Sequence, residues 1–254
     1  MGTFGIIFLS ATSGDYETGL FSAAFKLLSF CLIPTIIIQT AFSPSISRAA
    51  TLEEKKQSIA KYSKIIALLG SAIATTFSFF PDVFTVIVYG DKYTDSITIL
   101  RVLMFNCFIV YYNTSIAPIL FLWKLEKKSI YAYTISVISC IGLNILLIPH
   151  WNGIGAAFAT LGADITLAIA LSYFFFKEIH RLYLFDFLKL IGLGLLSGFI
   201  GKSVLSLADL QNVYFQFIGI AITLISLSFF VLKFRIVELD EIKKIFKKDA
   251  TVAE

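Results

Sequence analysis

A single acidic residue, Asp164, lies in the middle of an apolar segment that spans residues 153–176. An ionised aspartate within a bilayer costs about 2.5–3.5 kcal/mol, so its side chain should face protein or water rather than lipid. Its neighbours at helical spacing are small and suit close helix packing: Gly153, Ala157, Thr160 and Ala168. Asp164 is therefore a candidate site for a coupling ion or proton, a partner for a cation in a cavity, or a neutral hydrogen-bonded group at a helix interface.

A lysine also lies inside an apolar segment. Lys26 belongs to the segment 19–41 and should sit about 10 Å below the outer membrane surface. Its small neighbours Ser22, Ala23 and Ala24 favour a packed helix surface, where the amine would meet an anionic substrate inside a cavity. The alternative is a lysine that reaches the lipid headgroups along its own aliphatic stem.

Three asparagines accompany these charges. Asn106 and Asn113 are about two helical turns apart, so they share one helix face, and Asn144 lies on the following apolar segment. Such amides join transmembrane helices through hydrogen bonds, and less often contact substrate. We keep all three as candidate substrate contacts.

The glycine-rich stretch GLGLLSGFIGKS, residues 192–203, is not a phosphate-binding loop. The Walker pattern requires a glycine five places before Gly201, but that position is a leucine, and the stretch lies within an apolar span. Gly194 and Gly198 instead form a GxxxG pattern that lets two helices approach closely.

The remaining reactive residues predict neither catalysis nor metal binding. The cysteines are odd in number, lack a CxxC spacing and lie within apolar runs: Cys31, Cys107 and Cys140. His150 and His180 fall in loops on opposite sides of the predicted membrane, without partners. We therefore expect a protein that is not an enzyme and has no cofactor or metal.

The composition predicts an all-α integral membrane protein. Of 254 residues, 57% are hydrophobic and 15% charged, and the mean hydropathy is +0.85. Seven segments reach the length of about 20 apolar residues that a helix needs to cross a bilayer. They are residues 19–41, 62–80, 97–122, 129–148, 153–176, 190–207 and 213–232. The first stretch, MGTFGIIFLSAT, has only half that length and predicts a partial helix.

The distribution of cations predicts the orientation. Lysine and arginine gather in alternate loops and in the C-terminal tail, whereas the opposite loops are mainly acidic. By the positive-inside rule, the basic loops and the C-terminus face the cytoplasm. The tail KFRIVELDEIKKIFKK spaces its apolar residues for an amphipathic helix on the anionic inner leaflet, although a solvated basic tail explains it as well. A net charge of +4, so dispersed, does not indicate a nucleic-acid partner.

Three stretches together resemble a known family. They are DYETGLFSAAFKLL (15–28), VIVYGDKYTDSITILRVL (86–103) and NILLIPHWNGIGAAFATLGAD (144–164). The first contains an acidic residue, Glu17, shortly before Gly19, and then Lys26; the second contains a Y-G-x-x-Y pattern. The third, the most specific, is an N-x-x-L-I-P hairpin with Pro149, Gly153 and Gly155, followed by small residues. In this order they resemble the polysaccharide flippases of the multidrug/oligosaccharidyl-lipid/polysaccharide exporter superfamily, of the O-antigen or teichoic acid type.

The resemblance implies a MATE-like fold of two six-helix lobes around a central cavity, plus two C-terminal helices. This chain matches helices seven, in part, to fourteen, so we expect it to be the C-terminal half, without the N-terminal lobe. Residues 1–176 would form the transporter lobe, 177–232 the two additional helices, and 233–254 the basic cytoplasmic tail.

The resemblance further implies a substrate and partners. The expected function is alternating-access export of a polysaccharide repeat unit in the bacterial cytoplasmic (inner) membrane. Lys26 would meet the pyrophosphate of an undecaprenyl-pyrophosphate-linked oligosaccharide, and Asp164 would point into the lobe. A polysaccharide polymerase and glycosyltransferases are the expected functional partners, beside the lipid bilayer and the missing lobe. The alternatives are a multidrug antiporter, a peptidoglycan-precursor flippase, a membrane glycosyl- or acyltransferase, or a structural membrane subunit.

The predicted orientation can be tested at the turn of residues 208–212, between the last two apolar segments. A reporter tag inserted there should be reached from outside the cell, because the preceding and following basic clusters are held in the cytoplasm. A tag at the C-terminus is the control and should be cytosolic. A cytosolic signal from the 208–212 tag would contradict the predicted topology.

Overall fold

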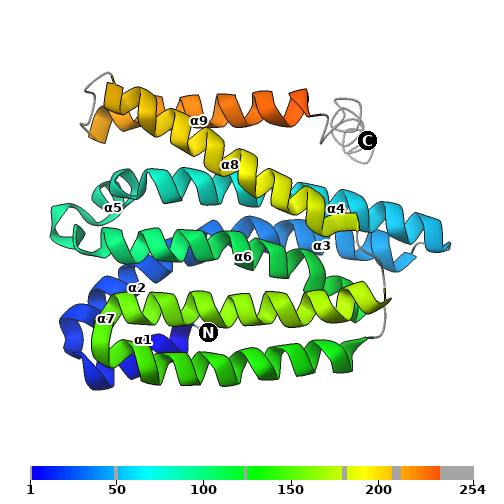
Figure 1. Cartoon of the computed structure of the whole chain (residues 1–254), viewed down its shortest axis with the longest axis horizontal. Coiled ribbons are helices and arrows are strands. Elements are labelled where there is room, and N and C mark those ends of the chain that lie inside the picture. The colour runs from blue at the N-terminus through cyan, green and yellow to red at the C-terminus, as the bar shows by residue number, and fades with distance from the viewer. Residues whose placement is uncertain (1, 49–50, 123–124, 179–181, 208–212, 235–254) are drawn as a thin grey trace, which may run out of the picture.

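A computed structural model of the chain describes residues 2–48, 51–122, 125–178, 182–207 and 213–234. This part of the chain is helical and contains no strand. The elements are α1 (Gly2–Thr12), α2 (Gly14–Cys31), α3 (Ile33–Arg48), α4 (Leu52–Phe79), α5 (Pro81–Tyr89), the short 3-10 helix η1 (Asp91–Tyr93), α6 (Ser96–Leu122), α7 (Glu126–Glu178), α8 (Leu182–Leu207) and α9 (Val213–Lys233). The helices pack side by side along the long axis of the molecule (Figure 1).

Several helices have the length and composition that a membrane requires. Six spans of the described chain qualify: Gly14–Arg48, Gln57–Phe79, Ser96–Phe121, Glu126–Lys177, Phe187–Ser206 and Phe215–Lys233. The predicted class, an all-α multi-pass membrane bundle, is confirmed at this level. Helix α1 spans only about 16 Å, half of the hydrocarbon layer, as predicted for a partial helix.

Helix α7 contains two of the predicted segments, 129–148 and 153–176. A straight helix of its 53 residues would be about 80 Å long, but the backbone leaves helical geometry at Asn152, where φ is 45° and ψ is −126°. The two limbs therefore turn back on each other and lie side by side (Figure 1). Counting each limb as one crossing gives seven.

The turn falls within the predicted hairpin of Pro149, Gly153 and Gly155. The helix continues through Pro149 and turns at Asn152, since asparagine tolerates a positive φ better than most residues. Gly155 follows the turn, and a Cβ atom there would lie 2.4 Å from the carbonyl oxygen of Leu147. Glycine is thus required for the limbs to approach this closely.

The predicted segment 19–41 is broken into α2 and α3. Thr35 donates its backbone N–H to Leu32 at 3.1 Å rather than to Cys31, and Pro34 has no N–H to donate. The carbonyl of Cys31 accepts a hydrogen bond from the hydroxyl of Tyr111, on α6, at 2.7 Å. The side chain from α6 thus replaces the helical bond lost at the break.

Helix α6 occupies the centre of the bundle and packs against α2, α4 and α7 (Figure 1). It contains Pro118, which cannot donate to the carbonyl of Thr114 one turn earlier. The hydroxyl of Tyr62, on α4, donates to that carbonyl at 2.8 Å, and the Tyr62 side chain is buried. The hydrogen bond lost at Pro118 is thus replaced by a tyrosine hydroxyl, as is the one lost at Pro34.

Helix α8 packs on α4 through the predicted GxxxG glycines. A Cβ atom on Gly194 would lie 2.5 Å from the hydroxyl oxygens of Ser71 and Thr75, and one on Gly198 would lie 2.3 Å from the Phe79 ring. Ser71 also donates to the carbonyl of Leu190 at 2.7 Å. The close approach of α4 and α8 therefore depends on the lack of a side chain at Gly194 and Gly198.

The ends of the bundle differ in charge. The end at which α3, α6, the second limb of α7 and α9 finish carries most of the cations in the described chain (Figure 1). The opposite end contains Asp15, Glu17, Asp82, Asp91 and Asp95. The described helices thus separate the basic and the acidic residues between the two ends of the bundle, which is the charge distribution from which the orientation was predicted. The expected tail beyond residue 234 and the 208–212 turn lie outside the described residues.

Tyr62→Phe tests the compensation of the Pro118 break. Removing the hydroxyl leaves the Thr114 carbonyl without a donor and should lower the free energy of unfolding by about 0.6–1.7 kcal/mol. The measurement is reversible unfolding by SDS in mixed micelles. Tyr131→Phe, which alters an exposed tyrosine of α7, is the control and should be neutral. Equal stability of the Tyr62→Phe variant and the wild type would contradict the compensation.

Gly194→Ala and Gly192→Ala form a matched pair on α8. The first adds a methyl group against Ser71 and Thr75 and should destabilise the bundle by about 1–3 kcal/mol. A Cβ on Gly192 meets nothing within 4 Å, so this variant should be neutral or stabilised through helix propensity. Thermal melting in detergent distinguishes the two. Melting curves that coincide would show that α4 and α8 are not in close contact.

Candidate functional site: a polar cleft beside Asp164

Asp164 lies near the middle of the second limb of α7, about 18 Å along the helix from the turn at Asn152. Its side chain is only 9% exposed. The helix therefore places a carboxyl group at mid-depth and turns it toward protein. This location agrees with the expectation that an acid in this segment avoids lipid.

Two asparagines of α6 hold Asp164. The Nδ2 of Asn106 donates to Oδ2 of Asp164 at 2.8 Å, and the Nδ2 of Asn113 donates to the backbone oxygen of Asp164 at 3.0 Å. The two asparagines are 0% and 4% exposed. The shared helix face predicted for them is thus the face that meets α7.

This arrangement leaves the side-chain oxygens of the two asparagines without hydrogen-bond donors. A backbone carbonyl only accepts, so the amide of Asn113 must turn its nitrogen toward Asp164 and its oxygen away. The Oδ1 atoms of Asn113 and Asn106 are buried and have no hydrogen-bond partner within the described chain. A buried acceptor without a donor costs about 1–3 kcal/mol, so the site favours a ligand that donates.

An open cleft of about 350 Å³ adjoins Asp164. Its polar lining comes from Gln39 of α3, Asn113 and Thr114 of α6, Tyr133 of the first limb of α7, and Asp164 itself. Pro118 and Phe121, from the C-terminal turns of α6, line it as well. The cleft therefore extends from mid-depth toward the basic end of the bundle.

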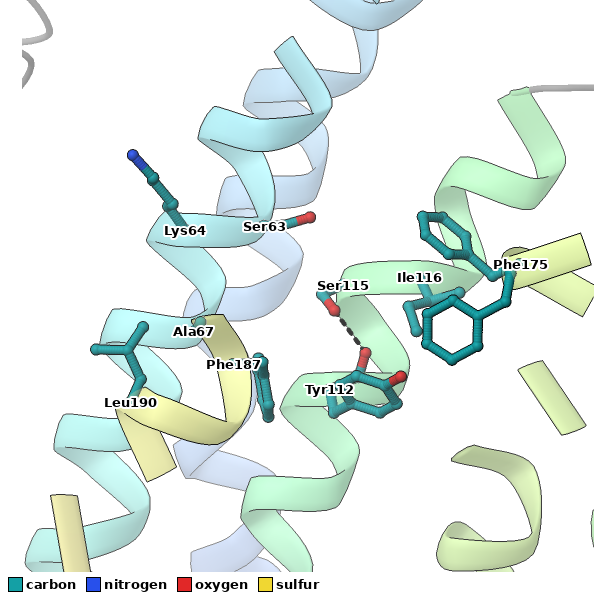
Figure 2. A pocket seen from close by; sticks show the side chains of 10 residues that line it. Ser63, Lys64, Ala67, Tyr112, Ser115, Ile116, Phe175, Phe187 and Leu190 are labelled. Carbon is teal, nitrogen blue, oxygen red and sulfur yellow. Dashed lines mark hydrogen bonds between the residues drawn. The ribbon is translucent and has the colours of Figure 1, made fainter. Parts of the chain in front are cut away.

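A second crevice, between α4, α6, α7 and α8, is much smaller (Figure 2). Its volume is about 20 Å³, enough for roughly one water molecule. Figure 2 shows Ser63 directed toward α6 and Lys64 directed away from it, while Ser115 donates to the Tyr112 carbonyl at 2.7 Å. The difference in volume makes the cleft beside Asp164 the candidate site.

Other predicted residues lie outside the cleft. Asn144 is buried in the first limb of α7, where it donates to the backbone oxygen of Cys140 at 2.7 Å. Lys26 has an exposed side chain on α2 and does not line the cleft. Neither residue contacts Asp164 through a hydrogen bond in the described structure, so the structure assembles only Asn106, Asn113 and Asp164.

Some contributors were not predicted. Tyr133 lines the cleft, yet an aromatic residue in a transmembrane segment has no spacing that marks it as functional. Glu17 accepts the backbone N–H of Gly153 at 3.1 Å, so it fastens the start of α2 to the α7 turn. Glu17 belongs to the stretch 15–28 that resembles the flippase family, which marks it as a residue of interest. Its hydrogen bond to Gly153 could not be predicted, because it depends on how α2 packs against α7.

The residues give no support for a metal centre: the described chain contains no group of three or more His, Cys, Asp or Glu side chains placed to hold an ion. The fold and the cleft define a multi-pass helical membrane protein with an internal polar site. Comparison of the chain with protein-family models, with curated proteins and with solved structures finds no match in any of the three.

A double-variant cycle tests the pairing of Asn106 with Asp164. Asn106→Leu removes the donor to Oδ2 and should lower the free energy of unfolding by about 1–3 kcal/mol. Asp164→Leu should lower the free energy of unfolding by a similar amount. The double variant should lose less than the two single losses added together, because it leaves neither the amide nor the carboxyl group buried without its partner. SDS unfolding provides the four values, with Phe105→Leu, an exposed neighbour on α6, as control. Strict additivity would rule out the pairing.

Proposed function

We propose that this chain is the C-terminal lobe of a lipid-linked oligosaccharide flippase that works by alternating access. The observation that carries the proposal is the Asp164 carboxyl group, held at mid-depth by two α6 amides beside an open cleft. A structural subunit has no need of such a group, because a buried acid destabilises a membrane bundle. Transporters of this kind bind their substrates at mid-depth between helices.

The exposed position of Lys26 fits the same function. In a lone lobe, a cavity-facing side chain is uncovered, and Lys26 is exposed on α2 although it lies in an apolar span. A cation there would attract the pyrophosphate of an undecaprenyl-linked oligosaccharide, with charge-assisted hydrogen bonds to the phosphate oxygens. The N-terminal lobe, supplied by further sequence or another chain, would complete the cavity.

The MATE-like assignment also accommodates the arrangement of helices. Helix α1 to the second limb of α7 would form the six-helix lobe, and α8 and α9 the two additional helices. The seven full crossings would place the basic end and the C-terminus in the cytoplasm of a bacterial cell. The long α2–α3 segment, broken at Leu32, would be one of the interrupted helices that such transporters use.

The flippase and the antiporter of the same superfamily differ in what moves. Cells that depend on the full-length protein should lose surface polysaccharide when it is removed and regain it when it is restored. Efflux of a cationic dye driven by an ion gradient, with surface polysaccharide unchanged, would favour the multidrug antiporter instead. Loss of cell-wall synthesis would favour the peptidoglycan-precursor flippase.

Lys26→Ala in the full-length protein tests the proposed phosphate contact. Losing one charge-assisted hydrogen bond should reduce flipping of the lipid-linked oligosaccharide about tenfold or more, at unchanged expression. The measurement is surface polysaccharide, or flipping of a fluorescent analogue in proteoliposomes. Lys92→Ala, which removes an exposed cation from η1, is the matched control. Unaltered flipping by the Lys26→Ala variant would refute the contact.

A further inference from the structure

Buried amide oxygens near the cleft beside Asp164 lack hydrogen-bond donors. Asn106 and Asn113 each use their Nδ2 to bind Asp164, and only one carboxylate oxygen, Oδ2, takes part in these bonds. The side-chain oxygens of both asparagines are buried and have no hydrogen-bond donor within the described chain, and Asn113 lines the cleft directly. The site therefore lacks a hydrogen-bond donor for these oxygens, and beside the Asp164 carboxyl group a positively charged donor would be favoured.

The lining provides no cation to complete it. None of the described residues that line the cleft is lysine, arginine or histidine. The described lining therefore offers Asp164 no cationic side chain, the usual partner of a buried carboxylate. A bound ligand would supply the charge.

The size of the cleft selects among cationic ligands. Its volume of about 350 Å³ falls within the range of small-molecule sites, roughly 300–1,000 Å³. One water molecule occupies about 30 Å³, so a lone alkali ion would leave most of the space to solvent. An organic cation with a body of several heavy atoms fills the cleft better.

The mouth of the cleft also favours an organic cation. Tyr133 and Phe121 line it and are 39% and 46% exposed, so their rings remain accessible. Aromatic faces attract ammonium groups and pack against the apolar faces of sugars and similar ring systems. The apolar walls from Ala117 and Leu167 supply contacts for the remainder of the ligand.

We propose that the cleft between α3, α6 and α7 binds a ligand through its ammonium group, which Asp164 and the side-chain oxygen of Asn113 accept. This inference rests on the proposed function, in which the ligand is an amino sugar of the carried oligosaccharide. Asp164 then selects substrates with a free amine. The cleft would bind the sugar, while Lys26 would bind the pyrophosphate.

The test measures binding of three sugars to the purified full chain by calorimetry: glucosamine, N-acetylglucosamine and glucose. The three share the ring, but only glucosamine carries a positive charge at neutral pH. Glucosamine should bind at least about tenfold more tightly than the other two, the factor expected for one charged hydrogen bond. Equal affinity for all three, or no binding of glucosamine, would overturn the inference.

Asp164→Asn keeps the shape of the side chain and removes its charge, so it should abolish the preference for glucosamine. Asp91→Asn makes the same change at an exposed site in η1 and should leave the preference intact. Sodium chloride, compared with potassium chloride at equal ionic strength, tests whether the site binds sodium instead. Specific displacement of glucosamine by sodium would assign Asp164 to an inorganic ion and overturn the inference.

A labelling experiment covers the case in which Asp164→Asn does not fold. Gln39→Cys places a thiol at the edge of the cleft, whereas the three native cysteines are buried. Glucosamine should slow maleimide labelling of this variant several-fold, and N-acetylglucosamine should not. Labelling at the same rate with either sugar would count against the inference.

These outcomes are separable from the proposed function. Flipping of the cell's own lipid-linked oligosaccharide, measured in the full-length protein, is scored independently of glucosamine binding. If that flipping occurs while glucosamine fails to bind, the flippase proposal survives and the ammonium inference falls. If glucosamine binds while no oligosaccharide is flipped, the site is real but serves another function.

Discussion

The constraint on which this structure depends is that lipid offers no hydrogen bonds. Every backbone group freed at a break in a transmembrane helix must find a partner within the protein. Tyrosine hydroxyls from neighbouring helices complete two such breaks, at Leu32–Pro34 and at Pro118: Tyr111 binds the Cys31 carbonyl, and Tyr62 binds that of Thr114. The tyrosines thereby fix how α2, α4 and α6 sit against one another.

The same constraint explains why the centre of the bundle is polar at one place. Helix α6 donates two amides to Asp164, and these bonds orient the carboxyl group away from lipid. These bonds use the amide nitrogens of Asn106 and Asn113. The side-chain oxygens of the same two residues are left buried without a hydrogen-bond donor. The cleft at this point connects the stability of the fold to its proposed function, because a ligand would satisfy what the protein leaves unpaired.

Much of this could be predicted from local pattern. The cost of a charge in lipid predicted that Asp164 faces protein, and helical periodicity placed Asn106 and Asn113 on one face. The partners of long-range bonds could not be predicted, since the pairing of Tyr62 with Thr114 depends on how α4 packs on α6. The hairpin of α7 was predicted around Pro149 and Gly153, but not the residue that makes the turn: the helix continues through the proline, and the positive φ falls on Asn152. The substrate and the role of Lys26 stay predictions.

The central claim is that Asp164 faces an aqueous cleft and not acyl chains. Nitroxide scanning of residues 163–171 in a lipid bilayer measures this directly, in a variant whose three buried cysteines are replaced by serine or alanine. Positions 164 and 167, which line the cleft, should be most accessible to a water-soluble nickel complex, and the exposed positions 165 and 169 to oxygen. A maximum of oxygen accessibility at positions 164 and 167 would place the carboxyl face in lipid and contradict the account.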